Sequence, residues 1–177
     1  MEVNKIISHA LQSMPPSKRQ KAFAKDTSKL IHMGLNENNY GMSPKAVAAL
    51  EDSMAGSHFY PDFAAVLLKQ KVAEQYGLKA ENVLTGAGSG AMIDMIGLTF
   101  LDEGDEVLFS APTYGAFADM AYLNGGVPVS VPVTEEQKFN LPAMKEKIGE
   151  KTKIVVNLDQ VCWWLPVRTK SGLRRLR

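Results

Sequence analysis

The sequence contains a single cysteine, Cys162, and only three histidines, which lie far apart in the chain. One cysteine cannot form an internal disulfide, and no His or Cys cluster has metal-ligand spacing, so we expect a reducing compartment and no bound metal. No apolar run is long enough for a membrane span or a signal peptide. These features predict a cytoplasmic protein that does not contact a membrane.

An excess of charge of one sign is also lacking. The 177 residues include 20 basic and 19 acidic side chains, which gives a net charge of +1. Five basic residues and no acidic ones follow Asp159, so the preceding part has 15 basic and 19 acidic residues and a net charge near −4. An acidic body does not attract nucleic acid, which is therefore excluded as a partner. The hydrophobic content of 45% is that of a globular domain with a sizeable core.

The first half of the chain predicts helices. Residues 1–30 suit a short amphipathic helix and a polar connector that contains Pro15 and Pro16. A second helix is expected to begin with Ser43 as N-cap and Pro44 at the first helical position. A third extends from about residue 63 to residue 76 and ends at Gly77.

From Val83 onward, short apolar runs of β type alternate with helical segments. The runs are continuously apolar, which is typical of strands buried on both faces and joined by right-handed crossovers. The sequence therefore predicts an α/β fold with a mostly parallel, helix-covered sheet. The expected strands are residues 83–85, 107–109, 127–131 and 154–156, and the expected helices are residues 89–101, 114–123 and 141–148.

This alternation ends near Asn157. Residues 158–177 contain two adjacent tryptophans, a proline and a basic end without a sustained period. A four-stranded sheet that ends here lacks the partner elements that this architecture normally has. We interpret residues 158–177 as an aberrant or disordered basic tail that results from a frameshift, a wrongly placed gene boundary or a truncation.

The stretch VLTGAGSGAMIDM, residues 83–95, is a glycine-rich turn between an expected strand and an expected helix. Residues 86–91 fit the pattern G-x-G-x-x-A of a dinucleotide site. That site needs an acid at the end of the second strand, whereas Asp105 and Glu106 lie at its start. Alternatively, Ser89, Gly90 and Ala91 form the first helical turn, whose free N–H groups and dipole bind one phosphate. A tight turn that binds nothing is the third possibility.

Four motifs in order resemble fold-type I pyridoxal-phosphate aminotransferases, most closely the histidinol-phosphate aminotransferase group. The resemblance covers about residues 30–157. It implies an N-terminal arm and connector over residues 1–34 and an incomplete large domain that binds pyridoxal 5'-phosphate over residues 35–157. The motifs are LNENNYGMSP at 35–44, HFYPD at 58–62, TGAGSGAMIDMI at 85–96 and LDEGDEVLFSAPTYGAF at 101–117.

The resemblance assigns the cofactor contacts. It implies that Gly88, Ser89, Gly90 and Ala91 hold the cofactor phosphate, and that Tyr114 of the P-T-Y motif stacks on the pyridine ring. Many relatives have acidic residues at the positions of Gly90 and Ala91, so this site depends on backbone N–H groups and Ser89.

The resemblance also implies contacts from the preceding segments. Tyr60 matches a tyrosine that reaches the partner's cofactor phosphate across a homodimer interface. Asn36 and Tyr40 match the segment that closes over the substrate, where relatives usually have proline at the position of Asn39. A surface turn at Tyr60 and a polar turn at residues 36–39 are the alternative interpretations.

Transamination also needs a lysine that forms an imine with the cofactor and an aspartate at the pyridine nitrogen. The resemblance locates both, with the arginine for the substrate carboxylate, beyond the matched part. Lys170 matches the lysine motif poorly, because one residue is absent before Gly172. We therefore expect an inactive portion of an enzyme that exchanges an amino group between an amino acid or amino-alcohol phosphate and a 2-oxo acid. A nicotinamide-dependent oxidoreductase domain and a non-catalytic binding or assembly fragment remain as alternatives.

Overall fold

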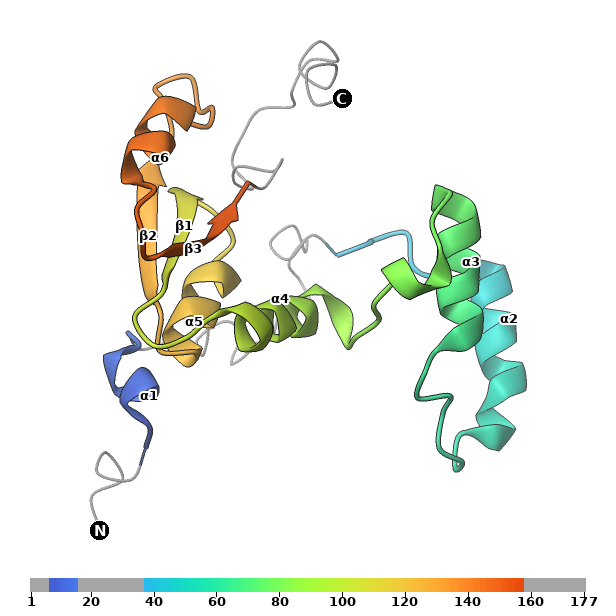
Figure 1. The fold of residues 1–177 in the computed structure, drawn as a ribbon. Helices are drawn as coiled ribbons and strands as arrows, with labels where there is room; N and C mark the ends of the chain where they lie inside the picture. The colour runs from blue at the N-terminus through green and yellow to red at the C-terminus, as the bar shows by residue number, and fades with distance from the viewer. Residues whose placement is uncertain (1–6, 16–36, 158–177) are drawn as a thin grey trace, which may run out of the picture. The chain divides into compact units, whose positions relative to one another are not determined.

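The computed structural model describes residues 7–15 and 37–157, which belong to two compact units (Figure 1). Residues 37–85 form the helical unit, and residues 7–15 with residues 86–157 form the sheet unit.

The helical unit contains α2 (Pro44–Ser53), η3 (Met54–Gly56), α3 (Val66–Tyr76) and η4 (Ala80–Asn82). The Ser43 hydroxyl oxygen accepts a hydrogen bond from the Ala46 N–H at 3.2 Å, and Pro44 occupies the first turn. Helix α3 ends at Gly77, which has the left-handed φ of 66° that glycine tolerates best. Both predicted helix boundaries, at Ser43 and at Gly77, are confirmed.

The start of α3 differs from the prediction, because the helix begins at Val66 and not at residue 63. The Asp62 carboxylate accepts hydrogen bonds from the N–H groups of Ala64 and Val66, at 3.0 Å and 2.7 Å. Ala65 has a left-handed φ of 48°. The side chain of Asp62 therefore holds a turn where the apolar spacing alone predicted helix.

The predicted strand at residues 83–85 is wrong. The described sheet has three strands, and this segment is not among them. The Val83 N–H donates to the carbonyl of Ala80 at 3.1 Å and so closes the turn of η4. An apolar run does not make a strand when its backbone has no neighbouring strand with which to pair.

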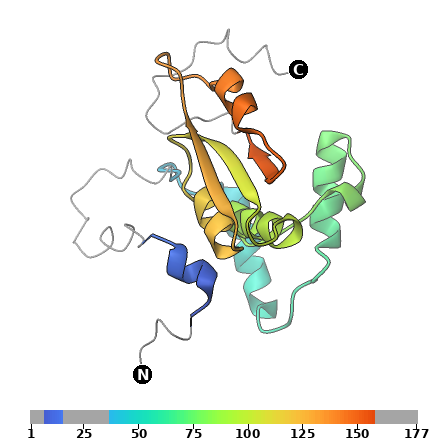
Figure 2. The ribbon, with the colours of Figure 1, turned by 60° about the vertical axis from the view of Figure 1, so that its left-hand side comes forward.

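The sheet unit consists of three parallel strands, β1 (Glu106–Ala111), β2 (Val127–Pro132) and β3 (Thr152–Val156), in the order β2-β1-β3. Its helices are α1 (His9–Ser13), α4 (Gly88–Phe100), α5 (Ala116–Leu123) and α6 (Leu141–Lys147). Helix α5 connects β1 to β2, and α6 connects β2 to β3 on the far side of β1 (Figures 1 and 2). Two right-handed crossovers that run in opposite directions place their helices on opposite faces of the sheet.

Both faces of β1 are buried. Val107 and Phe109 pack in one cluster with Met120 and Ala121 of α5. Leu108, which points to the opposite face, packs with Met144 of α6 in a second cluster. The prediction of a helix-covered parallel sheet from continuously apolar runs is confirmed, because each successive side chain of β1 meets a different helical layer.

The one buried polar side chain of the described residues also lies on β1. Ser110 is 2% exposed, and its hydroxyl donates to Sδ of Met144 at 3.3 Å. The contact gives the hydroxyl a weak acceptor inside the core.

Helix α4 packs against α5 at a glycine. A Cβ atom at Gly97 would lie 2.5 Å from Cγ of Met120 and 2.5 Å from Nδ2 of Asn124. Ordinary contacts between such atoms are about 3.5–4.0 Å long. The two helices can therefore approach this closely only because residue 97 has no side chain.

The turns at the carboxyl ends of α4 and α5 are bonded to each other. The Gly104 N–H donates to the Gly125 carbonyl at 2.9 Å, and the Val127 N–H donates to the Asp105 carbonyl at 2.8 Å. These bonds form a junction, residues 102–105 with residues 124–127, at the amino end of β1 and β2. The junction and the Gly97 contact together fix one end of α4 to the sheet.

Asp105 stabilises this junction through its carboxylate. Its Oδ2 accepts a hydrogen bond from the Asp102 N–H at 3.0 Å and lies 3.4 Å from Nζ of Lys153 on β3. The Asp102 N–H and, to a smaller extent, the Lys153 ammonium hold the pKa of Asp105 below its ordinary value of 3.8.

Among residues 7–15 and 37–157, no helix combines the length and the apolar character needed to cross a membrane.

The Gly97 contact predicts opposite outcomes for two glycine substitutions in the same helix. Gly97→Ala should lower the free energy of unfolding by about 1–3 kcal/mol, because the added methyl group overpacks the contact with Met120 and Asn124. Gly90→Ala should leave it unchanged or raise it by up to about 1 kcal/mol, because a Cβ there meets nothing within 4 Å. Urea unfolding of the full chain measures both. Equal effects of the two substitutions would contradict the packing described here.

Candidate functional site

The amino end of α4 has the geometry of an anion site. The helix begins at Gly88, which has a φ of +78°, and its N-cap residue Ala87 offers no side-chain acceptor to the first turn. The Gly88 N–H donates to the Gly86 carbonyl at 2.8 Å. The N–H groups of Ser89 and Gly90 come next, at positions whose N–H groups have no acceptor within an α-helix. We call residues 88–91 the phosphate cup.

The surroundings of the phosphate cup favour negative charge. Its first turn contains no acidic residue, so no carboxylate competes with an incoming anion for the N–H groups. Ser89 is exposed, Gly90 and Ala91 are half-buried, and a Cβ at Gly90 would meet nothing within 4 Å. Asp94, one turn further along, is exposed. A phosphate group can therefore approach the backbone closely and receive an additional hydrogen bond from the Ser89 hydroxyl.

Tyr114 lies in the loop that connects the carboxyl end of β1 to α5. Its ring meets the ring of Phe117 edge to face, with the centroids 6.2 Å apart and the planes at 90°. Phe117 packs on the cluster that contains Phe109 and Met120. The core thus supports Tyr114 through Phe117, while the tyrosine itself is only half-buried.

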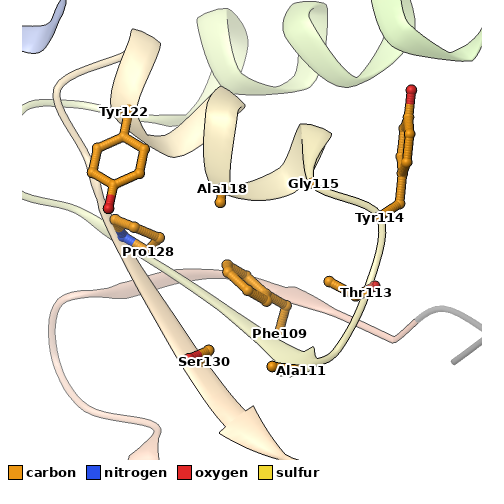
Figure 3. A pocket seen from close by; sticks show the side chains of 9 residues that line it. All are labelled: Phe109, Ala111, Thr113, Tyr114, Gly115, Ala118, Tyr122, Pro128 and Ser130. Atoms are coloured by element: carbon orange, nitrogen blue, oxygen red, sulfur yellow. The ribbon is translucent and has the colours of Figure 1, made fainter. Parts of the chain in front are cut away.

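An open cavity of about 340 Å³ lies beside Tyr114, between α5 and the strands β1 and β2 (Figure 3). Figure 3 shows Tyr114 at one edge of the cavity and Tyr122 at the other, with Phe109 between them. The remaining lining residues are small or uncharged, and they include Thr113 and Ser130. None of the lining residues is a lysine, so the described part of the chain places no amine in this cavity.

The sheet unit contains the phosphate cup and Tyr114, but the other predicted site residues belong elsewhere. Tyr60 and Tyr40 are in the helical unit. Tyr60 is 88% exposed and contacts only the ring of Phe63 among the aromatic side chains described, with a centroid distance of 5.7 Å. Tyr40 is fully exposed, and its N–H donates to Oδ1 of Asn38 at 3.1 Å. Asn36 lies outside the described residues.

The geometry argues against the dinucleotide interpretation. Glu106 is the first residue of β1, and Asp105 precedes it, so both acids lie at the amino end of the strand. Asp105 is engaged with Asp102 and Lys153. The carboxyl end of β1, Ser110 and Ala111, carries no acid that could bind ribose hydroxyls.

Sequence reasoning missed two features of the site. The first is the close contact at Gly97, which a glycine inside a predicted helix could have indicated. The second is the cavity, to which Ser130 and Pro128 of β2 contribute. No local pattern identifies these residues, because the pairing of β2 with β1 brings them beside Tyr114.

Among the residues that the structure describes, no group of three His, Cys, Asp or Glu side chains is arranged to hold a metal ion.

Comparison with known proteins identifies the family. The model of the family "aminotransferase class I and II" matches residues 28–157, which is most of the chain. The chain belongs to this family. The resemblance inferred from the four motifs is therefore confirmed, and so is the fold class.

The similar proteins of this family include enzymes with different names. The chain is 32% identical over 120 residues to histidinol-phosphate aminotransferase 2 of Carboxydothermus hydrogenoformans, and the match covers 68% of this chain and 33% of that protein. It is also 32% identical over 120 residues to an aromatic amino acid aminotransferase of Corynebacterium glutamicum, with 68% of this chain and 35% of that protein covered. The chain thus spans about a third of the length of the curated relatives that it matches.

A solved structure shows the same fold. The crystal structure of histidinol-phosphate aminotransferase from Sinorhizobium meliloti in complex with pyridoxal-5'-phosphate superimposes with a TM-score of 0.68 at 22% sequence identity. The superposition covers 82% of this chain and 40% of that one. The cofactor expected from the sequence is the one bound in that structure.

Proposed function

We propose that this chain carries the phosphate-binding part of a pyridoxal-phosphate-dependent aminotransferase related to the histidinol-phosphate aminotransferases. The complete enzyme transfers an amino group from an amino acid or amino-alcohol phosphate to a 2-oxo acid. One observation supports this proposal above all others. Helix α4 begins with no side-chain cap and no acid in its first turn, in a chain of the aminotransferase class I and II family.

The residues of the sheet unit fit the cofactor's phosphate. The N–H groups of Ser89 and Gly90 and the Ser89 hydroxyl provide hydrogen-bond donors on one side of α4, and the helix dipole adds partial positive charge there. Gly88 and Gly90 have no side chains that would hinder a phosphate. The space beside each is also open, because a Cβ at either position would meet nothing within 4 Å. Residues 35–157 accordingly form the cofactor-binding part of the chain, and residues 1–34 form an arm.

Tyr114 provides the support for the pyridine ring. When it is bound, pyridoxal phosphate supplies a conjugated ring that accepts electrons from the reacting carbon of the substrate. The face of the Tyr114 ring limits how that ring can tilt, and it excludes water from one side. The edge-to-face contact with Phe117 holds the Tyr114 ring in its orientation.

Residues of the helical unit complete the site in a homodimer. The Tyr60 side chain is 88% exposed, so its hydroxyl is accessible for a contact with the cofactor phosphate of a partner subunit. Asn36 and Tyr40 close over the substrate, and the complete exposure of Tyr40 leaves it available for this contact.

The described residues do not supply the amine that holds the cofactor covalently. No lysine lines the cavity beside Tyr114. We propose that the chain, taken alone, binds pyridoxal phosphate without covalent attachment and does not transfer amino groups.

The phosphate cup predicts a selective loss of cofactor affinity in Ser89→Ala. The substitution removes one hydrogen bond to a charged group, so the Kd for pyridoxal phosphate should rise about tenfold or more. Asp94→Asn, on the next turn of α4, should change the Kd by less than about twofold, because Asp94 is exposed and points to solvent. Equilibrium dialysis of the full chain measures both constants. Equal Kd values for the wild type and Ser89→Ala would contradict the phosphate cup.

The homodimer predicts that Tyr60 acts in trans. The full chain should form dimers in sedimentation experiments, and Tyr60→Phe should weaken the binding of pyridoxal phosphate by about tenfold without dissociating them. Tyr76→Phe is the matched control, because Tyr76 is a 68% exposed tyrosine of the same unit and has no proposed role. The proposed role of Tyr60 is wrong if the chain is a monomer and Tyr60→Phe binds pyridoxal phosphate as tightly as the wild type.

The missing amine predicts the outcome of borohydride reduction. The chain incubated with pyridoxal phosphate and borohydride should not acquire one pyridoxyl group per chain at a single lysine, since no lysine among residues 7–15 and 37–157 lines the cavity. Peptide mapping after reduction checks this. Stoichiometric labelling that is lost in Lys170→Ala would show that Lys170 holds the cofactor and that the proposed inactivity is wrong.

A further inference from the structure

The amino end of α4 depends on contacts at its opposite end. Gly97 lies eight residues after Ser89, which corresponds to about 12 Å along the helix axis. Between them, Ile93 packs on the cluster of α5 and β1, while Met95 and Ile96 are 39% and 43% exposed. The phosphate cup has no side-chain cap of its own, so its position follows from how the rest of α4 is seated.

We propose that Gly97 and Asn124 are positioning residues, which set the distance between the phosphate cup on α4 and the ring support Tyr114 on the β1–α5 loop. This inference rests on the proposed function, since it concerns the same cofactor site. The cup and Tyr114 belong to different segments, and neither segment contacts the cofactor through Gly97 or Asn124. The α4–α5 contact at Gly97 is the point where the two segments are held in close packing.

Asn124 makes this contact rigid. Its Nδ2 donates to the Met120 carbonyl at 2.8 Å, and its backbone N–H donates to the carbonyls of Met120 and Ala121 at 3.3 Å and 3.2 Å. The backbone bonds hold Asn124 at the carboxyl end of α5, and its side-chain amide cannot turn away without losing the bond to the Met120 carbonyl. It is the same amide that would lie 2.5 Å from a Cβ at Gly97.

The junction limits the movement of α4 relative to α5. Gly104 and Gly125 are joined by the hydrogen bond of 2.9 Å in the junction, directly after the ends of α4 and α5. A Cβ at Gly126 would lie 2.8 Å from the Asp105 carbonyl oxygen, so this turn is also closely packed. A methyl group at residue 97 must therefore move α4 by about 1 Å away from α5, since normal contacts are about 3.5–4.0 Å.

A displacement of this size matters for the cofactor. The phosphate and the ring of pyridoxal phosphate are parts of one small molecule, so the cup and Tyr114 cannot both fit it after α4 has moved. Hydrogen bonds weaken steeply as their geometry departs from the optimum. Gly97→Ala should consequently weaken the binding of pyridoxal phosphate without touching it.

The test combines a distance and an affinity. Spin labels at Asp94→Cys on α4 and Lys145→Cys on α6, in a chain with Cys162→Ser, report the spacing across the sheet, because both positions are exposed. Gly97→Ala should change the mean distance between the labels by about 1 Å and raise the Kd for pyridoxal phosphate by about tenfold. Val131→Ala is the control for lost stability, because it opens the core cluster of Leu108 and Met144, away from the α4–α5 contact. It should leave the Kd within about twofold of the wild type.

A second variant covers the possibility that Gly97→Ala does not fold. Asn124→Ala removes the amide from the contact and should broaden the distance distribution, with a smaller rise in the Kd for pyridoxal phosphate. An unchanged distance distribution in either folded variant would overturn the positioning role. So would a displaced α4 with an unchanged Kd. If the wild-type chain does not bind pyridoxal phosphate, the proposed function fails, and the distance measurement alone still decides whether Gly97 positions α4.

Discussion

The burial of β1 between two helical layers is the constraint on which the rest of the sheet unit depends. Val107 and Phe109 face α5, whereas Leu108 faces α6, so the strand has no solvent-exposed face. The side chains of Val107 and Leu108 are fully inaccessible. Burial of such side chains contributes roughly 1.5–3 kcal/mol each, which makes β1 the rigid element of the unit. Helix α4 and Tyr114 both take their positions from this strand.

The site uses this rigidity in two ways. The carboxyl end of β1 leads directly into the loop of Tyr114, and Phe117 connects the tyrosine ring to the core below it. Helix α4 lies on the same core through Ile93 and Gly97, and it presents its amino end without a cap. Together, the amino end of α4 and the Tyr114 ring can hold a small ligand that has an anionic group and a flat ring. The family of the chain agrees with this chemistry.

The sequence predicted the parts of the structure that depend on local chemistry. The boundaries at Ser43 and Gly77 follow from capping, and the parallel strands follow from continuously apolar runs. The segment at residues 83–85 was misread because strand formation needs a partner, which an apolar run does not reveal. The delayed start of α3 has a similar origin, since the Asp62 carboxylate competes for N–H groups that the spacing assigned to the helix.

The site itself was only partly accessible from the sequence. The turn and helix start at residues 88–91 could be predicted because a glycine-rich turn before a helix is a local feature, and their phosphate-binding role stays a prediction. The contact of Gly97 with Asn124 and the cavity between α5 and β2 join residues that are distant in the sequence. They depend on side-chain packing and on strand pairing, neither of which a single sequence displays. A histidinol-phosphate aminotransferase and an aromatic amino acid aminotransferase match the chain with the same identity, so the matched part does not distinguish these two groups.

The proposed function depends on the binding of the phosphate of pyridoxal phosphate by the open N–H groups at the start of α4. A titration of the ¹⁵N-labelled chain with that compound, followed by amide resonances, tests it most directly. We expect saturable shifts at Ser89 and Gly90, reproduced by inorganic phosphate at higher concentration, with shifts around Tyr114 only for the compound that carries a ring. Resonances of Ser89 and Gly90 that stay in place while others move on saturation would contradict it.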